Sequence, residues 1–292
     1  MQTKNKIFSF DVVIFCLLFG LLPVDMLNGF LLKEAGIESV VSISQVYKII
    51  LFFFIFIRIS STEKLMFISF FLLMLIPSVF QIFKSGSISL IFNDAIKITK
   101  YLGSFLTFLY FRSIFISKSY LLKWIYRWFS FSFLILFINI FLKLFGLGFP
   151  MYIMNSLEIG SKGYFYAGNE LSGVLLVLCS FLLYWHRLYN NKISFIIIAI
   201  LSLLTGIYVT SKTAILGTII IIIWFFIFDP RGKKISIKKI FSYLLVFFTI
   251  IPLSLYFIIK YLETSALMQR VSYYWNELDI YTFLLSNRNT FL

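Results

Sequence analysis

Apolar runs long enough to cross a bilayer recur along most of the chain and are separated by short polar segments. The longest run covers 193–228 and contains a single charge, Lys212. One straight helix of this length would span roughly 54 Å, whereas the hydrocarbon core of a bilayer is only about 30 Å thick. The run therefore predicts two helices that form a hairpin, with Lys212 at its tip.

The other apolar runs are continuous and do not alternate with period two, which favours helices over a β-barrel. The pattern predicts an all-α fold, a polytopic transmembrane helical bundle of about nine spans. We treat 1–260 as this single bundle and 261–292 as the start of an extracytoplasmic loop. The expected spans are 8–26, 40–57, 65–83, 96–116, 124–149, 169–189, 193–210, 213–228 and 240–260.

Composition supports a membrane protein. The chain is 61% hydrophobic and 13% charged, whereas soluble domains contain about 25% charged residues. A net charge of +14 would suggest nucleic acid in a soluble protein, but here the location of the charges matters more. No nucleic-acid partner is expected. Cys16 and Cys179 lie inside apolar runs without metal-ligand spacing. No metal and no cofactor is expected.

The basic residues between spans predict the orientation. With a cytoplasmic N-terminus they collect in the inner loops, most densely in DPRGKKISIKK (229–239). This cluster is best explained as a topological anchor, and binding of anionic membrane lipids is the alternative. The same orientation places three polar features on the outer side: the loop 150–168, the Lys212 turn and the sequence after about residue 260.

The outer segment GYFYAGNELSG (163–173) opens the sixth span. Asn169 is expected to cap that helix, and Glu170 to lie in its first turn, where a carboxylate suits the helix dipole. Helix capping alone accounts for the presence of Asn169 and Glu170 here, without a catalytic or binding role. A carboxylate at this end of a bundle can also act as a base or orient a sugar hydroxyl.

Lys212 lies in TSKTAILG, among hydroxyl residues. A lysine at an outer tip opposes the positive-inside bias, so we expect a local partner. A phosphate or pyrophosphate would serve, bound by hydroxyl groups and a helix N-terminus. The alternative is an ordinary solvated turn residue.

Two further pairs of basic residues are candidates for binding. Lys97 and Lys100 share one helical face near the outer end of the fourth span, where they either bind substrate or extend to the interface. Arg270 and Arg288 stand among aromatic and acidic residues of the last segment. That composition suits carbohydrate and phosphate recognition, and equally an amphipathic helix on the membrane surface.

These outer segments resemble the bacterial O-antigen polymerase and O-antigen ligase family. GYFYAGNELSG is followed about forty residues later by TSKTAILG, then a basic inner loop, a further span and an outer loop. By this resemblance Lys212 matches the family's basic residue after a serine, and Asn169 and Glu170 match its span-opening motif. Arg288, in SNR, is similar to the arginine of a Ser-Gly-Arg-like element, with Asn287 in place of glycine.

The resemblance implies a multi-pass glycosyltransferase of the bacterial inner membrane that uses undecaprenyl-pyrophosphate-linked glycans at the periplasmic face. An acceptor-sugar hydroxyl would attack the anomeric carbon of the donor, and basic side chains would neutralise the leaving pyrophosphate without a metal. Glu170 and Arg288 would be catalytic, and Lys97, Lys100, Asn169, Lys212 and Arg270 would bind substrate. A chain-length regulator protein is a further partner that the resemblance allows.

Polymerisation of repeat units into O-antigen or capsule-type polysaccharide is the leading expectation. The alternatives are a ligase that transfers glycan to lipid A core, a transporter or flippase of lipid-linked glycan, and an inactive truncated polymerase. A ligase usually needs an outer histidine, and His186 is predicted inside. A transporter would place charges within several spans and break helices at mid-membrane. Truncation is considered because 261–292 looks like the first part of a larger loop.

Overall fold

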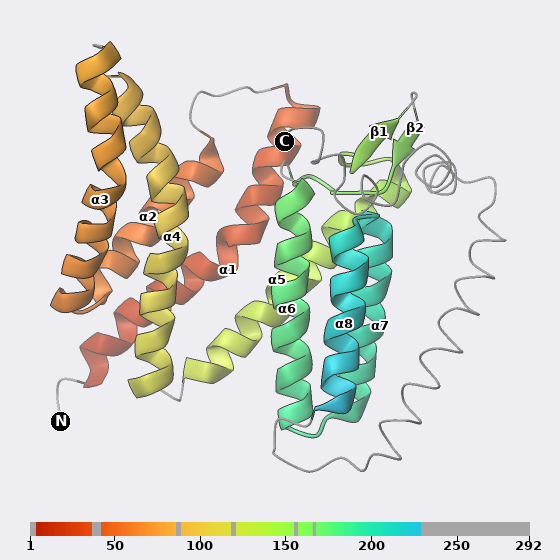
Figure 1. The fold of residues 1–292 in the computed structure, drawn as a ribbon. Coiled ribbons are helices and arrows are strands. Elements are labelled where there is room, and N and C mark those ends of the chain that lie inside the picture. The colour runs from red at the N-terminus through yellow and green to blue at the C-terminus, as the bar shows by residue number, and fades with distance from the viewer. Residues whose placement is uncertain are drawn as a thin grey trace. The chain divides into compact units, whose positions relative to one another are not determined.

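The computed structural model describes residues 4–36, 42–85, 89–117, 121–154, 157–165 and 168–228 (Figure 1). The ninth predicted span, the predicted boundary at residue 260, and Arg270 and Arg288 lie outside the described residues.

Eight α-helices of the described residues overlap the first eight predicted spans. They are α1 (Lys4–Glu34), α2 (Ile43–Arg58), α3 (Ser61–Ser85), α4 (Ser89–Ser117), α5 (Leu122–Phe141), α6 (Gly168–Leu188), α7 (Lys192–Val209) and α8 (Lys212–Ile227). Five helical stretches of the described residues are long and apolar enough to cross a membrane: Phe10–Glu34, Ser61–Gln81, Leu122–Phe145, Glu170–Leu188 and Lys192–Val209. The chain is therefore a helical membrane protein by length and composition, while nine spans and a cytoplasmic N-terminus stay predictions.

Two helices end well away from the predicted ends of their spans, and α4 begins at Ser89 rather than near 96. The first span was predicted to end at 26, before the polar residues that follow, but α1 continues to Glu34. Asp25 fits inside the longer helix because it accepts hydrogen bonds from Ser44 and Lys48 of α2. The fifth span was predicted to reach 149, but α5 ends at Phe141. A 3₁₀ helix, η2 (Leu142–Phe145), follows and closes at Gly146, whose φ of +76° is the left-handed conformation that glycine adopts easily.

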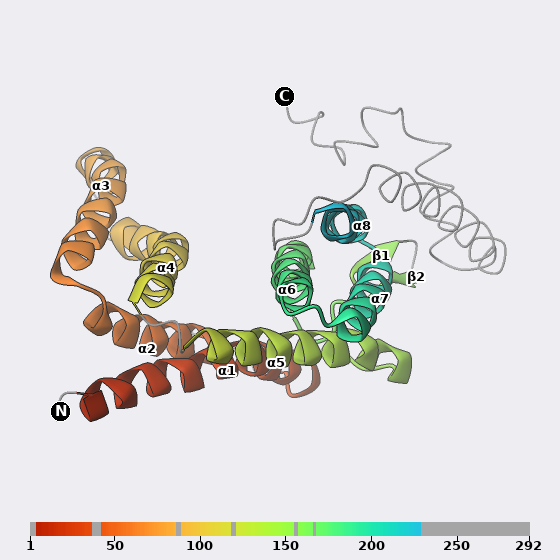
Figure 2. The same cartoon turned by 90° about the horizontal axis from the view of Figure 1, so that it is seen from below.

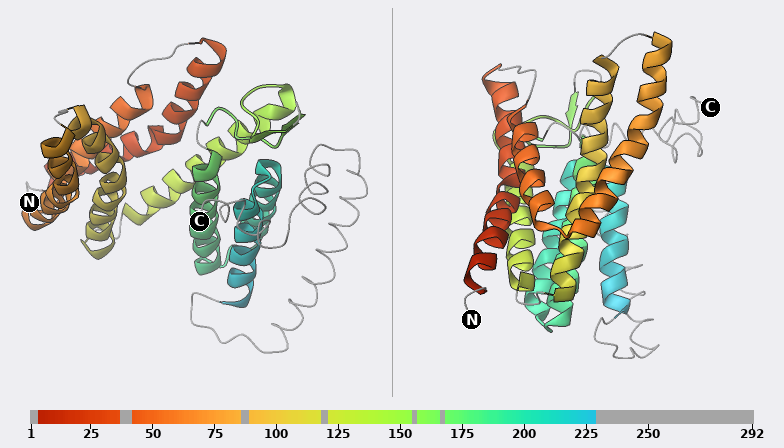
Figure 3. Two further views of the ribbon diagram at one scale, coloured as in Figure 1. Left: turned by 45° about the horizontal axis from the view of Figure 1, so that its top comes forward. Right: turned by 90° about the vertical axis from the view of Figure 1, so that its left-hand side faces the viewer.

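The chain forms two compact units. Unit 1 comprises 1–28 and 37–131, and unit 2 comprises 29–36 and 132–292. In unit 1, α3 and α4 pack side by side and α2 packs against α4 (Figures 2 and 3). Apolar side chains from α1, α2 and α4 are fully buried there: Ile14, Phe15, Leu51, Ile55, Leu106 and Leu109.

Carboxylates link neighbouring helices within unit 1. Asp11 of α1 is 1% exposed and accepts hydrogen bonds from Arg58 Nε of α2 (3.1 Å) and the Tyr110 hydroxyl of α4 (3.2 Å). Asp94 of α4 accepts one from Ser78 of α3 (2.8 Å). A buried carboxylate is costly unless paired and hydrogen-bonded, so these contacts explain how the helices carry charges.

In unit 2, α6, α7 and α8 pack against one another, and Figure 2 shows them nearly end-on. Their shared core contains Cys179, Leu183, Phe195, Ala199 and Ile222. A two-residue turn, Thr210–Ser211, joins α7 to α8, and Lys212 is the first residue of α8. The hairpin predicted from the 193–228 run is confirmed.

Candidate functional site

The site is built around the loop that connects η2 to α6. Its two ends meet, because Phe149 N donates to Gly163 O (2.6 Å) and Lys162 N donates to Phe149 O (3.1 Å). Between them, β1 (Tyr152–Met154) and β2 (Leu157–Ile159) form a small antiparallel hairpin. An all-α fold was predicted, so this hairpin is a correction. Strands this short carry too few residues for a periodic signal.

The end of α5 is joined to the closed loop by hydrogen bonds. Buried Asn139 accepts a hydrogen bond from Tyr164 N at its Oδ1 (3.0 Å), and buried Ser161 donates to Ile140 O (2.6 Å). A Cβ at Gly163 would lie 2.3 Å from Asn139 O, and its φ is +56°. Only glycine fits here, because both the space and the backbone conformation exclude a side chain.

The loop and the start of α6 also contact the α7–α8 turn. Ser161 N donates to Tyr208 O (3.0 Å), and Ser172 Oγ of α6 donates to Ser211 Oγ (2.9 Å). Both serines of the second contact are buried. The segment 163–173 and the Lys212 turn, about forty residues apart in sequence, therefore lie at the same end of unit 2.

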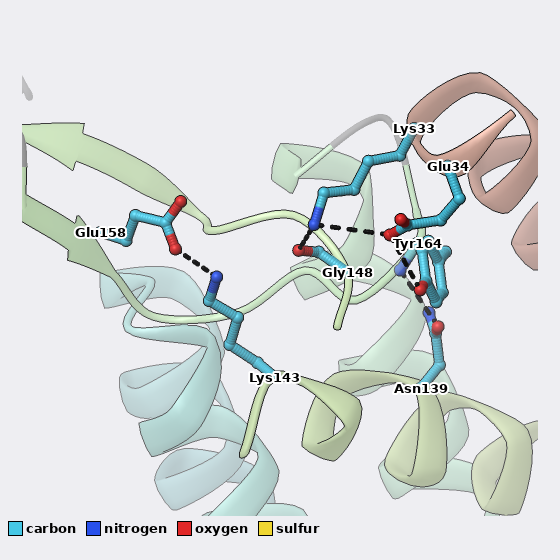
Figure 4. A network of polar contacts seen from close by, with 7 residues as sticks. All are labelled: Lys33, Glu34, Asn139, Lys143, Gly148, Glu158 and Tyr164. Carbon is cyan, nitrogen blue, oxygen red and sulfur yellow. Dashed lines mark hydrogen bonds and ion pairs between the residues drawn. The ribbon is translucent and has the colours of Figure 1, made fainter. Parts of the chain in front are cut away.

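The last turn of α1, which belongs to unit 2, completes this end (Figure 4). Lys33 Nζ donates to Gly148 O (2.6 Å), and the Tyr164 hydroxyl donates to Glu34 Oε1 (3.2 Å). A Cβ at Gly29 would lie 1.6 Å from Tyr164 O, so α1 can approach only because residue 29 is glycine. These contacts fix the longer α1 onto the loop.

Charged side chains gather on the loop. Lys143 of η2 pairs with Glu158 of β2, and this hydrogen bond lowers the pKa of the Glu158 carboxyl (Figure 4). The ammonium groups of Lys33 and Lys162 lie 5.6 Å and 5.4 Å from the centroid of the same Phe149 ring. We call Lys33, Lys143 and Lys162 the lysine cluster.

Burial shifts the pKa of two further groups of the loop. It lowers the pKa of the Lys162 ammonium, because desolvation disfavours the charged form. It raises the pKa of the Tyr164 hydroxyl, and the hydrogen bond to Glu34 acts in the same direction. The loop is thus a partly desolvated region in which electrostatic contacts are stronger than in water.

The structure places the predicted site residues of unit 2 as follows. Glu170 is exposed in the first turn of α6, and Lys212 is partly buried at the start of α8. Asn169 does not cap α6, because the helix begins at Gly168 and so contains it. The side chain of Asn169 lies outside the described residues. Glu170 and Lys212 are thus at one end of the unit.

The other candidate lysines belong to unit 1. Lys97 is 70% exposed and pairs with Asp94 over 3.7 Å, one turn earlier on α4. Lys100 lies on the same helix, and its side chain is outside the described residues. A local ion pair accounts for Lys97 without a ligand.

Sequence reasoning missed the role of Lys33, Glu34, Lys162 and Tyr164. They lie outside any periodic pattern, and their partners are distant in sequence. The available signal was the glycine spacing around the loop: Gly146, Gly148, Gly160 and Gly163 all have positive φ. Several glycines in a short polar segment predict tight turns and hence a folded loop.

Within the described ranges, no group of three or more His, Cys, Asp and Glu side chains is arranged to hold a metal ion. Comparison with protein-family models, with curated proteins and with solved structures found no match.

Proposed function

We propose that this chain is a glycosyltransferase of the O-antigen polymerase type, which joins undecaprenyl-pyrophosphate-linked repeat units at the outer face of the bacterial inner membrane. The observation that carries the proposal is the hydrogen bond between Ser172 and Ser211. It holds the two segments on which the family resemblance rests, 163–173 and the Lys212 turn, at one end of unit 2.

The charge distribution at this end supports the proposal. Lys212 begins α8, where the helix N-terminus adds partial positive charge, and the lysine cluster lies around the neighbouring loop. Gly160 of that loop contacts Thr210 of the turn. Cationic groups suit a reaction in which negative charge develops on a leaving pyrophosphate.

In the proposed reaction an acceptor-sugar hydroxyl attacks the anomeric carbon of the donor glycan. The new glycosidic bond forms as the bond to the pyrophosphate oxygen breaks, and that oxygen keeps the electron pair. The proton of the hydroxyl passes to a carboxylate, for which Glu170 is the exposed candidate. Lys212 and Arg288 would stabilise the leaving group, with Asn169 and Arg270 as binding residues.

A ligase is the nearer alternative, and the position of His186 speaks against it. His186 is buried in the last turn of α6, roughly 24 Å along the helix axis from Glu170 at 1.5 Å per residue. A histidine at that distance cannot serve chemistry at the loop. Transfer of glycan to lipid A core therefore receives no support from His186.

A transporter of lipid-linked glycan is a second candidate from another class. The buried Asp11, paired with Arg58, is the kind of intramembrane charge that transporters use. Against this, α1 to α8 each run without a break through the described residues, whereas transporter sites are typically formed by broken helices. We therefore favour a transferase over a transporter.

The test is glycan chain length in the natural host. We expect Lys212→Ala and Arg288→Ala each to abolish long chains and to leave single-unit glycans, as resolved by gel electrophoresis. Lys192→Ala is the matched control, because Lys192 is an exposed first residue of α7 at the opposite end of unit 2. Normal long-chain glycan in both site variants would contradict the proposed site.

A further inference from the structure

Large apolar side chains are exposed where α5 ends and the loop begins. Leu144 and Phe145 of η2 are 62% and 78% exposed, and Leu147, which follows η2, is 42% exposed. Ile153 of β1 is 73% exposed. Soluble proteins rarely expose apolar surface of this kind unless it contacts a partner. We call these four residues the apolar patch.

The backbone fixes the part of the patch that follows α5. Leu147 N donates to Leu142 O (3.2 Å), and Gly146 N donates to Lys143 O (3.0 Å). With Gly146 in the left-handed conformation, these two bonds form a Schellman motif, which commonly ends a helix. The exposure of the apolar side chains here therefore follows from a hydrogen-bonded helix end.

The hairpin extends the patch beyond η2. Ile153 is the antiparallel partner of Glu158, so the two side chains lie on the same face of the hairpin. Glu158 pairs with Lys143, the residue before Leu144 (Figure 4). Ile153 is therefore on the side of the hairpin that contacts η2.

The position of the patch at the end of an apolar helical stretch indicates its partner. Leu122–Phe145 is long and apolar enough to cross a membrane, and the patch begins at its last residues. Its 24 residues span roughly 36 Å, and the hydrocarbon core of a bilayer is about 30 Å thick, so Phe145 falls at the membrane–water interface. Leu134 and Ile138 of α5, one turn apart, are 52% and 46% exposed within the same stretch. The patch thus continues an apolar surface that suits lipid.

We propose that the apolar patch inserts into the membrane–water interface at this end of unit 2, so that phospholipid covers it. Apolar faces of interfacial segments lie about 5–10 Å into the boundary between headgroups and acyl chains. Lys143 does not oppose this position, because it is paired with Glu158 and a paired charge costs less to desolvate. Membrane contact at the patch does not require the proposed transferase reaction, so either can be wrong without the other.

The test measures the surroundings of a nitroxide spin label on the full chain in phosphatidylcholine vesicles. Cys16 and Cys179 are first replaced by alanine, and one cysteine is then introduced as Phe145→Cys or Ile153→Cys. Oxygen is apolar and concentrates in lipid, whereas a charge-neutral nickel chelate stays in water, so their collision rates with the label distinguish the two surroundings. Both substituted side chains are exposed, and an unchanged melting temperature shows that each variant is folded.

Two positions on α7 provide the references. Ile200 is 52% exposed near the middle of the helix and reports lipid, whereas Lys192 is its exposed first residue and reports water. We expect the ratio of oxygen to nickel collision rates at Phe145 and Ile153 to exceed that of Lys192→Cys and to approach that of Ile200→Cys.

Three results would overturn the inference. A ratio equal to that of Lys192→Cys at both patch positions would mean that the patch faces water. Low collision rates with both reagents would mean that a protein surface, such as a second copy of the chain, covers it. A lipid-like ratio at Phe145 with a water-like ratio at Ile153 would restrict lipid contact to the end of α5 and exclude the hairpin.

Discussion

The Tyr164 hydroxyl donates a hydrogen bond to Glu34 Oε1 over 3.2 Å and so joins two residues 130 positions apart in the sequence. Tyr164 belongs to the loop before α6, and Glu34 is the last residue of α1. The Tyr164 ring also contacts the Phe30 ring edge-on, with the ring centroids 5.3 Å apart. The last turn of α1 is therefore part of the candidate site.

This contact gives a first prediction for Tyr164→Phe. The ring contact with Phe30 stays, and only the hydrogen bond is lost, so the free energy of unfolding should fall by about 1 kcal/mol. Chemical unfolding in detergent measures the change. Tyr101→Phe is the matched control, because Tyr101 is 73% exposed and should show no change. Equal stability of Tyr164→Phe would mean that water replaces Glu34 at no cost.

Gly29→Ala should separate α1 from the loop. The new Cβ would lie 1.6 Å from Tyr164 O, so the backbone must shift, at a typical cost of about 1–3 kcal/mol. Gly173→Ala is the control on α6, because no atom lies within 4 Å of its Cβ position, and alanine favours a helix. Thermal unfolding should show a loss for the first variant and none for the second. A neutral Gly29→Ala would refute the close packing of α1.

Ser172 and Ser211 should be energetically coupled. We expect a double-mutant cycle with Ser172→Ala and Ser211→Ala to give a coupling of about 0.5–1.5 kcal/mol, because both side chains are buried and bonded to each other. Ser180 serves as the comparison, since it donates to Leu176 O of its own helix. A cycle between Ser180 and Ser211 should give no coupling. The same result for both cycles would refute the Ser172–Ser211 contact.

In unit 1, Arg58→Met should be strongly destabilising. It leaves the carboxylate of Asp11 buried without its cation, which typically costs about 3–5 kcal/mol. Lys48→Met is the matched control on the same helix. The Lys48–Asp25 pair is more exposed, with side chains 41% and 26% accessible, so its loss should cost less than about 1 kcal/mol. Similar losses in unfolding experiments would contradict this ranking.

The Lys143–Glu158 pair predicts an acid-dependent contribution to stability. The folded chain lowers the pKa of Glu158, so the folded state binds its proton less readily than the unfolded state does. The contribution is present above the ordinary glutamate pKa of about 4.3 and is lost as the pH falls through the lowered value. Melting curves of the unmodified chain and Glu158→Gln should differ at neutral pH and converge in acid. A difference that persists in acid would argue for another role of Glu158.

The sequence by itself determined which segments are helices and where the α7–α8 hairpin turns. The reason is length: an apolar run longer than a bilayer must fold back, and Lys212 marks the polar position where it does so. The ends of α1 and α5 were harder to predict from the sequence. Asp25 fits inside α1 through its contacts with Ser44 and Lys48, and the helical segment that α5 and η2 form closes only at the left-handed Gly146.

Only the tertiary structure decided how the site is composed. Lys33 and Gly148 are 115 residues apart, and Phe149 meets both Lys33 and Lys162. Contacts of this kind arise from the packing of α1 and α5 against a loop closed by glycines. The periodicity of apolar residues along the chain does not predict them. The sequence predicted a polar loop at this position. Packing brought Lys33 and Lys162, from two different segments, onto one aromatic ring beside this loop.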